Sequence, residues 1–234
     1  MSNTDVSKAQ KVHVIFDLDD TLYPERDHAH SGFRAAGRHA ETAWGVSGLA
    51  DEMIRRLDEG HLGQVFPMSV AALVPDHSDT HIAEVRAAYR DHDPEITLFD
   101  DGRWALEHYG AIAKLGLITD GNAGVQARKI GALDIAHHFA AKVLTGELGP
   151  DRAFHKPHPR AYELIEQQIG VAGDHYVYIG DNPAKDFVTP NARGWTSIQI
   201  IREKTIHDQN AEVAGGAPRH KIQSLRQLPE ILKF

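Results

Sequence analysis

The sequence contains no cysteine, which excludes disulfide bonds, thiolate nucleophiles and zinc sites built on thiolates. This composition is compatible with a reducing compartment, and we expect a cytoplasmic protein. No run of 18 apolar residues occurs, so the sequence predicts no membrane-spanning helix and no membrane partner. Residues 1–11 are polar and lack the apolar centre of a secretory signal, so we expect a short disordered tail there.

Positive charge is also scarce, with 25 Lys and Arg residues against 33 Asp and Glu residues and a formal net charge of −8. This acidic balance argues against a general nucleic-acid-binding surface. The 16 histidines are scattered and show no metal-ligand spacing, so we interpret most of them as solvated helix residues. Hydrophobic residues make up 41% of the 234 residues, which is typical of a globular protein that buries a core.

The most informative stretch of the chain is residues 12–22, an apolar run followed by three aspartates. Its first half is nearly continuously apolar and predicts a central parallel strand buried on both faces. Asp17, Asp19 and Asp20 follow at the carboxyl end, where open α/β sheets bind ligands. Two carboxylates about 4 Å apart repel by roughly 4 kcal/mol at an effective dielectric near 20, so this cluster requires a cation or a shared proton. Mg²⁺ prefers oxygen ligands and can supply the positive charge that this cluster needs. The alternative interpretation is an Asp-rich turn that caps a helix and binds no metal.

The rest of the chain divides into two patterns. After the first strand, helical spacing follows without any strand pattern, so we interpret residues 23–93 as a small all-α domain inserted there. From residue 94, helices and apolar strands alternate, which is typical of a doubly wound parallel sheet. We therefore predict an α/β core of residues 1–22 and 94–234. The predicted helices are 27–44, 49–57, 67–74, 78–90, 101–109, 123–132, 158–169, 183–192 and 223–232; the later strands are 113–118, 139–144, 175–179 and 196–201, with a loop at 204–218.

Three of the predicted strands end in polar side chains. Asp17 to Asp19 follow the first strand, residues 119–122 (Thr-Asp-Gly-Asn) follow the second, and residues 180–186 (Gly-Asp-Asn-Pro-Ala-Lys-Asp) follow a later one. Right-handed parallel connections bring such strand ends to one rim of the sheet. Lys156, at the start of a predicted helix, adds an ammonium group. The carboxylates can chelate Mg²⁺, and the hydroxyl, the ammonium and nearby backbone N–H groups can surround an anion. Together these groups predict a phosphate site built around a metal.

These four segments, in this order and at this spacing, resemble the haloacid dehalogenase superfamily of phosphohydrolases over about residues 12–201. The helical insert falls where one subclass of that superfamily carries its helical cap domain. The matching residues are Asp17-Leu18-Asp19-Asp20-Thr21 for the first motif, Thr119 for the second, Lys156 for the third, and Gly180-Asp181 with Asp186 for the fourth.

The resemblance implies roles for the carboxylates. Asp17 would be the nucleophile that forms an aspartyl-phosphate, and Asp19 would protonate the leaving alcohol and then activate water. Mg²⁺ would be held by Asp17, by the backbone carbonyl of Asp19 and by Asp181. Asp186 would position the lysine of the third motif.

The resemblance also implies the phosphate-binding residues. Thr119 would donate a hydrogen bond to a phosphoryl oxygen, and Lys156 would pair with both Asp17 and the phosphate. The neighbouring residues Asp120, Gly121 and Asn122 are expected to line the same phosphate site.

The function implied is that of a Mg²⁺-dependent phosphatase for a small phosphomonoester such as a sugar phosphate. A nucleoside monophosphate phosphatase and a phosphomutase are alternatives. A dehalogenase is disfavoured because it needs no acid at the Asp19 position. A receiver-like phospho-accepting switch is disfavoured because receivers are about half this length and have no helical insert. A phosphate-binding protein without catalysis is disfavoured because it would not need every catalytic residue. The sequence leaves the oligomeric state open.

Overall fold

The computed structural model describes residues 11–170 and 173–232. They form two compact units, one made of the chain up to Pro24 together with the chain from Leu98 onward, and one made of residues 25–97. All but the last residue of the predicted disordered tail, residues 1–11, lie outside the described residues.

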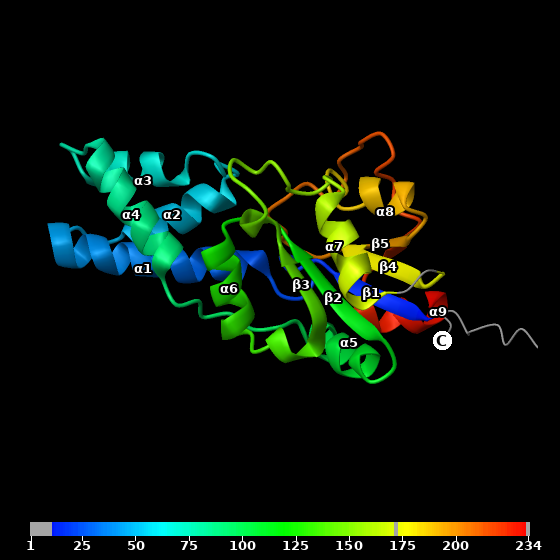
Figure 1. Ribbon diagram of the computed structural model, residues 1–234. Helices are drawn as coiled ribbons and strands as arrows, with labels where there is room; N and C mark the ends of the chain where they lie inside the picture. The colour runs from blue at the N-terminus through cyan, green and yellow to red at the C-terminus, as the bar shows by residue number, and fades with distance from the viewer. Residues whose placement is uncertain (1–10, 171–172, 233–234) are drawn as a thin grey trace, which may run out of the picture. The chain divides into compact units, whose positions relative to one another are not determined.

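The first unit is built on a six-stranded parallel sheet in the order β3-β2-β1-β4-β5-β6, which confirms the predicted doubly wound α/β fold (Figure 1). From β1 the chain moves outward on one side through β2 and β3, and then returns to β4 on the other side. The strand order therefore reverses between β1 and β4, and the crevice at such a reversal is where this class of sheet binds ligands. The strands are β1 (Val12–Phe16), β2 (Lys114–Thr119), β3 (Phe139–Leu144), β4 (His175–Gly180), β5 (Thr196–Ile200) and β6 (His220–Ile222).

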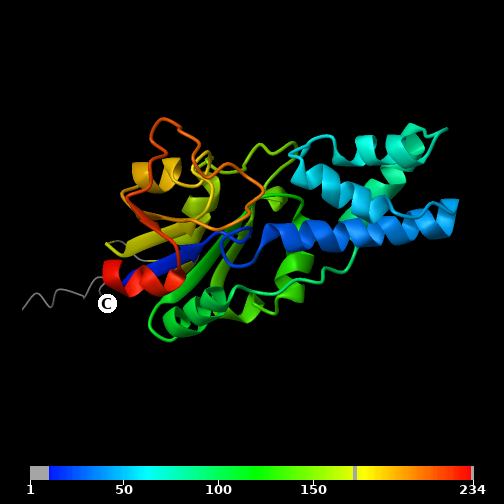
Figure 2. The same cartoon turned by 180° about the vertical axis from the view of Figure 1, so that it is seen from behind.

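Helices cover both faces of this sheet, with α5 and α6 on one face and α7 and α8 on the other, as right-handed crossovers require (Figures 1 and 2). A buried cluster that includes Ile15, Ile118, Tyr162 and Phe187 fills the space between the sheet and α7. The helices are α5 (Asp100–Gly110), α6 (Ala123–Ala132), α7 (Arg160–Ile169), α8 (Val188–Ala192) and α9 (Leu228–Ile231), with 3-10 turns η1 (Ala136–His138), η2 (Thr145–Glu147) and η3 (Leu225–Gln227).

The second unit contains only helices: α1 (Glu25–Trp44), α2 (Leu49–Asp58), α3 (Val65–Leu73) and α4 (Asp79–Asp91). The predicted helices of this stretch are present, with ends shifted by one or two residues. Its core includes Phe33, Met53, Val70 and Val85, all nearly inaccessible to solvent.

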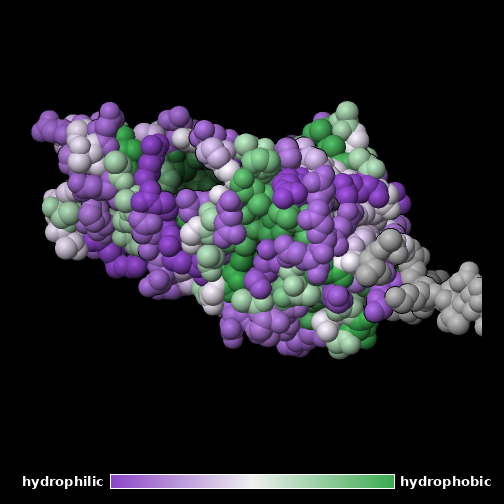
Figure 3. Space-filling model, viewed as in Figure 1, coloured by the Kyte–Doolittle hydropathy of each residue, from purple (hydrophilic) through white to green (hydrophobic). Residues whose placement is uncertain are grey.

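The surface carries few large hydrophobic side chains. On the face shown in Figure 3, hydrophilic residues cover most of the helical unit. Leu62, Ile112 and Val213 are the large hydrophobic residues that are exposed within the described part of the chain, and they are far apart in sequence. Scattered residues of this kind are normal for a globular protein. Within residues 11–170 and 173–232, no helix has the length and apolar character needed to cross a bilayer.

Near the C-terminus, two predicted helices were wrong and one strand was missed. The helix predicted at 183–192 begins only at Val188, because the Asn182 side chain accepts a hydrogen bond from Ala184 N (3.0 Å) and forms a turn instead. The helix predicted at 223–232 is a 3-10 turn followed by the single-turn helix α9. The strand β6 was missed, because three residues are too few to show a strand pattern.

Candidate active site

The nucleophile candidate Asp17 is placed by the sheet itself. It follows β1 directly, and its backbone N–H donates to the carbonyl of Ile179 in β4 (2.8 Å). Asp181 lies two residues after Ile179, so the pairing of the two central strands brings Asp17 and Asp181 together. These two carboxylates and that of Asp186 are buried, with ligand atoms within 4.8 Å of one another.

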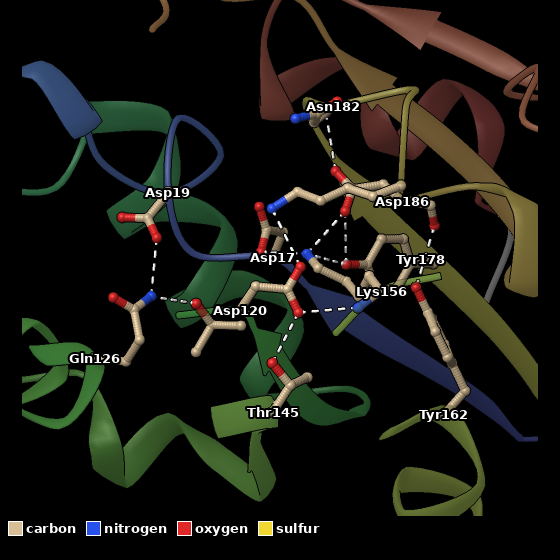
Figure 4. A network of polar contacts seen from close by, with 12 residues as sticks. Asp17, Asp19, Asp120, Gln126, Thr145, Lys156, Tyr162, Tyr178, Asn182 and Asp186 are labelled. Atoms are coloured by element: carbon tan, nitrogen blue, oxygen red, sulfur yellow. Dashed lines mark hydrogen bonds and ion pairs between the residues drawn. The ribbon is translucent and has the colours of Figure 1, made fainter. Parts of the chain in front are cut away.

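Lys156 lies at the centre of this acidic cluster, and its side chain is completely buried (Figure 4). Its Nζ is 2.6 Å from Oδ1 of Asp17 and 2.8 Å from Oδ1 of Asp186, and it donates to the hydroxyl of Tyr178 (2.9 Å). Burial alone would lower the pKa of Lys156, but the two carboxylates outweigh burial and hold that pKa well above its usual value. The lysine is therefore a fixed positive charge beside the nucleophile candidate.

The single ammonium of Lys156 does not balance the three carboxylates of the acidic cluster. Burial raises the pKa of Asp17 to about 6, although the Lys156 ammonium opposes the rise. Burial also raises the pKa of Asp181 well above its usual value, and the carboxylates of Asp186 and Asp17 add to this effect. Oδ2 of Asp181 is buried and accepts no hydrogen bond from residues 11–170 and 173–232. An unpaired carboxylate oxygen in a cluster of oxygen donors fits a divalent cation such as Mg²⁺.

The second predicted motif lies at the carboxyl end of β2. Thr119 is fully buried, and its hydroxyl accepts a hydrogen bond from Nε2 of Gln126. Gly121 adopts a positive φ of 121°, and Oδ1 of Asn122 accepts a hydrogen bond from Val125 N (3.1 Å), which caps the N-terminus of α6.

Asp120, from the same motif, is occupied by contacts with protein groups. Its Oδ1 accepts hydrogen bonds from Thr145 Oγ1 (2.8 Å) and from Lys156 N (3.0 Å), and its Oδ2 lies 3.3 Å from Lys185 Nζ. Burial alone would raise the pKa of Asp120, but the nearby lysines, Lys156 first, hold that pKa below its usual value. The carboxylate of Asp120 therefore fastens the loop that carries Lys156.

Asp19 lies apart from the acidic cluster and is held by a different group of side chains. Its Oδ1 is 2.7 Å from Lys129 Nζ and accepts a hydrogen bond from the Tyr23 hydroxyl, and its Oδ2 accepts one from Gln126 Nε2 (2.8 Å). Burial would raise the pKa of Asp19, but the Lys129 ammonium and these hydrogen bonds outweigh burial and hold that pKa far below its usual range. The side chain is 18% exposed, so it is both anchored and accessible.

Gln126 and Lys129 were not predicted as site residues, and neither were Thr145, Tyr178 and Lys185. A signal for the first two exists in the sequence, since they are three residues apart on the helix that directly follows the second motif and therefore share one face. The contacts of the others depend on side chains that meet only in the folded sheet.

Comparison with known proteins identifies the family. The model for haloacid dehalogenase-like hydrolases matches residues 12–188, and a second, HAD-hydrolase-like model matches residues 153–228. A glyceraldehyde 3-phosphate phosphatase of Methanopyrus kandleri is 29% identical over 239 residues, which cover 94% of this chain and 96% of that protein. Another of the same name, from Methanocaldococcus jannaschii, is 26% identical over 230 residues, with the same coverage of both chains.

A solved structure shares the fold at lower sequence identity. The 2-haloacid dehalogenase of Pseudomonas syringae superposes with a TM-score of 0.61 at 23% identity, over 95% of this chain and 97% of that one. Since the family model spans most of the chain and covers the acidic cluster, Lys156 and Asp19, the protein belongs to the haloacid dehalogenase-like hydrolases.

Proposed function

We propose that this protein is a Mg²⁺-dependent phosphatase that hydrolyses a small phosphomonoester through an aspartyl-phosphate on Asp17. The observation that carries the proposal is the pairing of Asp17 with the buried ammonium of Lys156, beside an Asp181 oxygen that accepts no hydrogen bond from any described residue. The names of the two relatives that cover most of the chain favour a small phosphorylated aldehyde or sugar phosphate as the substrate.

In the first half of the proposed reaction, a carboxylate oxygen of Asp17 attacks phosphorus and the bond from phosphorus to the leaving oxygen breaks. Lys129 and the hydrogen-bond donors hold Asp19 as a carboxylate in the free protein, so Asp19 first takes up a proton, which the negative charge of the bound phosphate favours. Asp19 then gives this proton to the leaving oxygen, so the product departs as an alcohol. In the second half, Asp19 takes a proton from water while the water oxygen attacks phosphorus. Inorganic phosphate is released and the Asp17 carboxylate is restored. Lys156 and Thr119 bind phosphoryl oxygens throughout.

Asp17, Asp181 and the backbone carbonyl of Asp19 would hold the Mg²⁺. When bound, the ion neutralises negative charge on the transferring phosphoryl group. Asp186 is committed elsewhere, because its carboxylate pairs with Lys156 at 2.8 Å and accepts a hydrogen bond from Asn182 N (2.9 Å). We assign it the role of positioning that lysine rather than binding the ion.

We propose that residues 25–97 serve as the cap domain that selects the leaving group. This assignment depends on the resemblance to the capped members of the superfamily and on the position of the unit, which follows the first motif directly in sequence.

Release of inorganic phosphate from a panel of substrates tests the function. The panel contains glyceraldehyde 3-phosphate, hexose phosphates, phosphoserine and nucleoside monophosphates, each with Mg²⁺ and with EDTA. We expect metal-dependent turnover concentrated on one small phosphomonoester, and a loss of about 10³-fold or more in Asp17→Asn. Asp51→Asn, which alters an exposed carboxylate of α2, is the matched control and should keep full activity.

Two results would contradict the proposal. Near-normal phosphate release by Asp17→Asn would exclude this residue as the nucleophile. Halide release from a 2-haloacid, with no phosphate released from any compound of the panel, would identify a dehalogenase instead.

A further inference from the structure

Helix α6 contributes two side chains to the carboxylate of Asp19. Lys129 Nζ is 2.7 Å from Oδ1, and Gln126 Nε2 donates to Oδ2 (2.8 Å), so each oxygen has its own partner on the same helix face. Figure 4 shows the Gln126 amide directed at Asp19. The Lys129 side chain is only 5% exposed. This helix therefore restrains the carboxylate at both oxygens.

Two further contacts extend this arrangement. The hydroxyl of Tyr23 donates to Oδ1 of Asp19, and Lys129 Nζ lies 5.9 Å from the centre of the Tyr23 ring. The amide of Gln126 also donates to the hydroxyl of Thr119. The same amide thus joins the proposed proton carrier to the proposed phosphate-binding hydroxyl, and fixes their separation.

The burial of Lys129 is not explained by packing. Lysine is almost never fully buried unless it is paired, and the desolvation of a buried ion pair commonly cancels its attraction. Replacing such a pair by apolar residues of similar volume is often neutral or stabilising. The stability of α6 therefore does not require an ammonium at position 129. An ammonium there is useful if the Asp19 carboxylate must keep one orientation.

We propose that Lys129 is a positioning residue for catalysis, which with Gln126 and Tyr23 holds Asp19 in the orientation required for proton transfer to the leaving oxygen. This inference rests on the proposed role of Asp19 as the proton carrier. Such transfer requires the two heavy atoms to come within about 2.6 to 3.2 Å of each other, so a carboxylate free to rotate would spend less time in reach.

The test compares two leaving groups in Lys129→Met. An alkyl phosphate needs a proton on its leaving oxygen, whereas the nitrophenolate of p-nitrophenyl phosphate departs without one. We expect kcat for the best alkyl phosphate of the panel to fall about 10²-fold, with KM changed less than about threefold. The pre-steady-state burst of nitrophenolate, which reports only the first half of the reaction, should slow less than about tenfold.

Three other variants sharpen the result. Lys129→Arg retains the positive charge and should recover at least about tenfold of the lost kcat. Gln126→Leu removes the donor to Oδ2 and should show the same difference between the two leaving groups, which keeps the inference testable if Lys129→Met does not fold. Lys142→Met removes an exposed lysine whose Nζ contacts only the carbonyl of Ala136 (3.2 Å) among the described contacts, and should behave as wild type.

A double-mutant cycle isolates the pair. If Lys129 acts through Asp19, Lys129→Met should cause no further loss in an Asp19→Asn background. Equal losses for both leaving groups, or a full additional loss in that background, would indicate a general structural role and would overturn the inference.

The outcomes also separate this inference from the proposed function. A wild-type protein that releases no phosphate, or an Asp19→Asn variant with full alkyl phosphate turnover, would refute the function and the inference with it. Wild-type kinetics in Lys129→Met and in Gln126→Leu, while Asp19→Asn loses most but not all of its alkyl phosphate turnover, would refute the positioning role alone.

Discussion

At the scale of single residues, Gly180 is a tight packing constraint in the site. It ends β4, and a Cβ atom placed there would lie 2.5 Å from Oδ2 of Asp186 and 2.8 Å from its Cγ. Asp186 is fully buried and contacts Lys156. The missing side chain of Gly180 is thus what allows Asp186 to lie against the strand and hold the lysine.

We expect Gly180→Ala to displace the Asp186 carboxylate and, with it, the Lys156 ammonium. The free energy of unfolding should fall by about 1 to 3 kcal/mol, as for other overpacked interiors, and phosphatase turnover should fall with it. Gly131→Ala is the control, because that glycine is inside α6 and no atom of a described residue lies within 4 Å of the added methyl group. Alanine there should raise the free energy of unfolding by up to about 1 kcal/mol. Urea unfolding of both variants makes the comparison; a Gly180→Ala protein as stable and active as wild type would contradict it.

The strand-end argument located Asp17, Thr119 and Asp181 near one another because it needs only the topology of a parallel sheet. Lys156 was predicted from its place before a helix and from the third motif of the family. The strand-end argument could not find Lys129, whose contact with Asp19 depends on the rotation of α6 about its own axis. The spacing in the sequence places Gln126 and Lys129 on one face of α6, but packing against the sheet decides the direction in which that face points.

At the scale of elements, the N-terminus of α6 depends on a single side chain. Asn122 Oδ1 accepts a hydrogen bond from Val125 N (3.1 Å) at the start of the helix that carries Gln126 and Lys129. We predict that Asn122→Ala lowers the free energy of unfolding by about 1 kcal/mol, whereas Asn122→Ser, which can still cap, lowers it by a few tenths.

Chemical denaturation of the two Asn122 variants measures the capping effect. Steady-state kinetics of the same variants, with kcat and KM, test the predicted contact of Asn122 with phosphate. If Asn122 binds phosphate through its amide, Asn122→Ser should raise KM despite the retained cap. Equal stability losses in both variants would refute the capping argument.

A second element-scale feature joins the C-terminal segment to the start of α5. Asp101 accepts hydrogen bonds from Arg202 Nη1 (2.8 Å) and Nη2 (2.9 Å), from Ser224 Oγ (3.0 Å) and from Leu225 N (2.9 Å). Arg202 Nη2 also donates to the carbonyl of Thr21 (2.8 Å), the last residue of the first motif. The segment after β5 therefore supports the loop that carries Asp19.

We expect Asp101→Asn to lower the free energy of unfolding at pH 7 by about 2 to 3 kcal/mol, because it removes charge-assisted hydrogen bonds to Arg202. Burial opposes ionisation of Asp101, but Arg202 holds its pKa below the usual value. A lowered carboxyl pKa contributes stability that is present above the pKa of the unfolded chain and lost as pH falls through the folded pKa.

The difference between wild type and Asp101→Asn should therefore shrink at strongly acidic pH. Urea unfolding at pH 7 and at acidic pH measures it, and Asp100→Asn, an exposed neighbour in the same helical turn, serves as the control. A difference that is constant with pH would contradict the ionic origin.

At the scale of the whole molecule, stability should depend on Mg²⁺ and pH together. The pKa of Asp17 is raised to about 6 and that of Asp181 is also raised, so the native metal-free protein binds more protons than the unfolded chain near neutral pH. The contribution of these groups to the free energy of unfolding therefore decreases as pH rises through about 6.

Because Mg²⁺ and protons compete for the same carboxylates, the ion should stabilise the protein more at pH 8 than at pH 5. At a free concentration 100 times its Kd, the gain is about 2.7 kcal/mol. Thermal unfolding with Mg²⁺ or EDTA at the two pH values tests this, and Asp181→Asn should lose most of the gain at pH 8. An equal gain at both pH values would show that the ion does not displace protons from this cluster.

The overall fold was predictable because the central strands carry long apolar runs and the helices between them are regularly spaced; β3 and α6 have the predicted bounds. The C-terminal part was harder. There α8 has five residues and β6 three, and their formation depends on the turn at Asn182 and on pairing of β6 with β5, which are properties of the folded chain.

The backbone hydrogen bond from Asp17 N to Ile179 O has a consequence for hydrogen exchange. β1 is flanked by β2 and β4, so this amide can exchange only when the middle of the sheet opens, and such amides report global unfolding. The Asp17 amide should thus be among the slowest to exchange in the chain, whereas amides in the loop before Lys156 exchange through smaller openings. Local unfolding of that loop would then move Lys156 away from Asp17, the proposed nucleophile, while β1 is still paired in the sheet. We expect activity to be lost before the sheet unfolds.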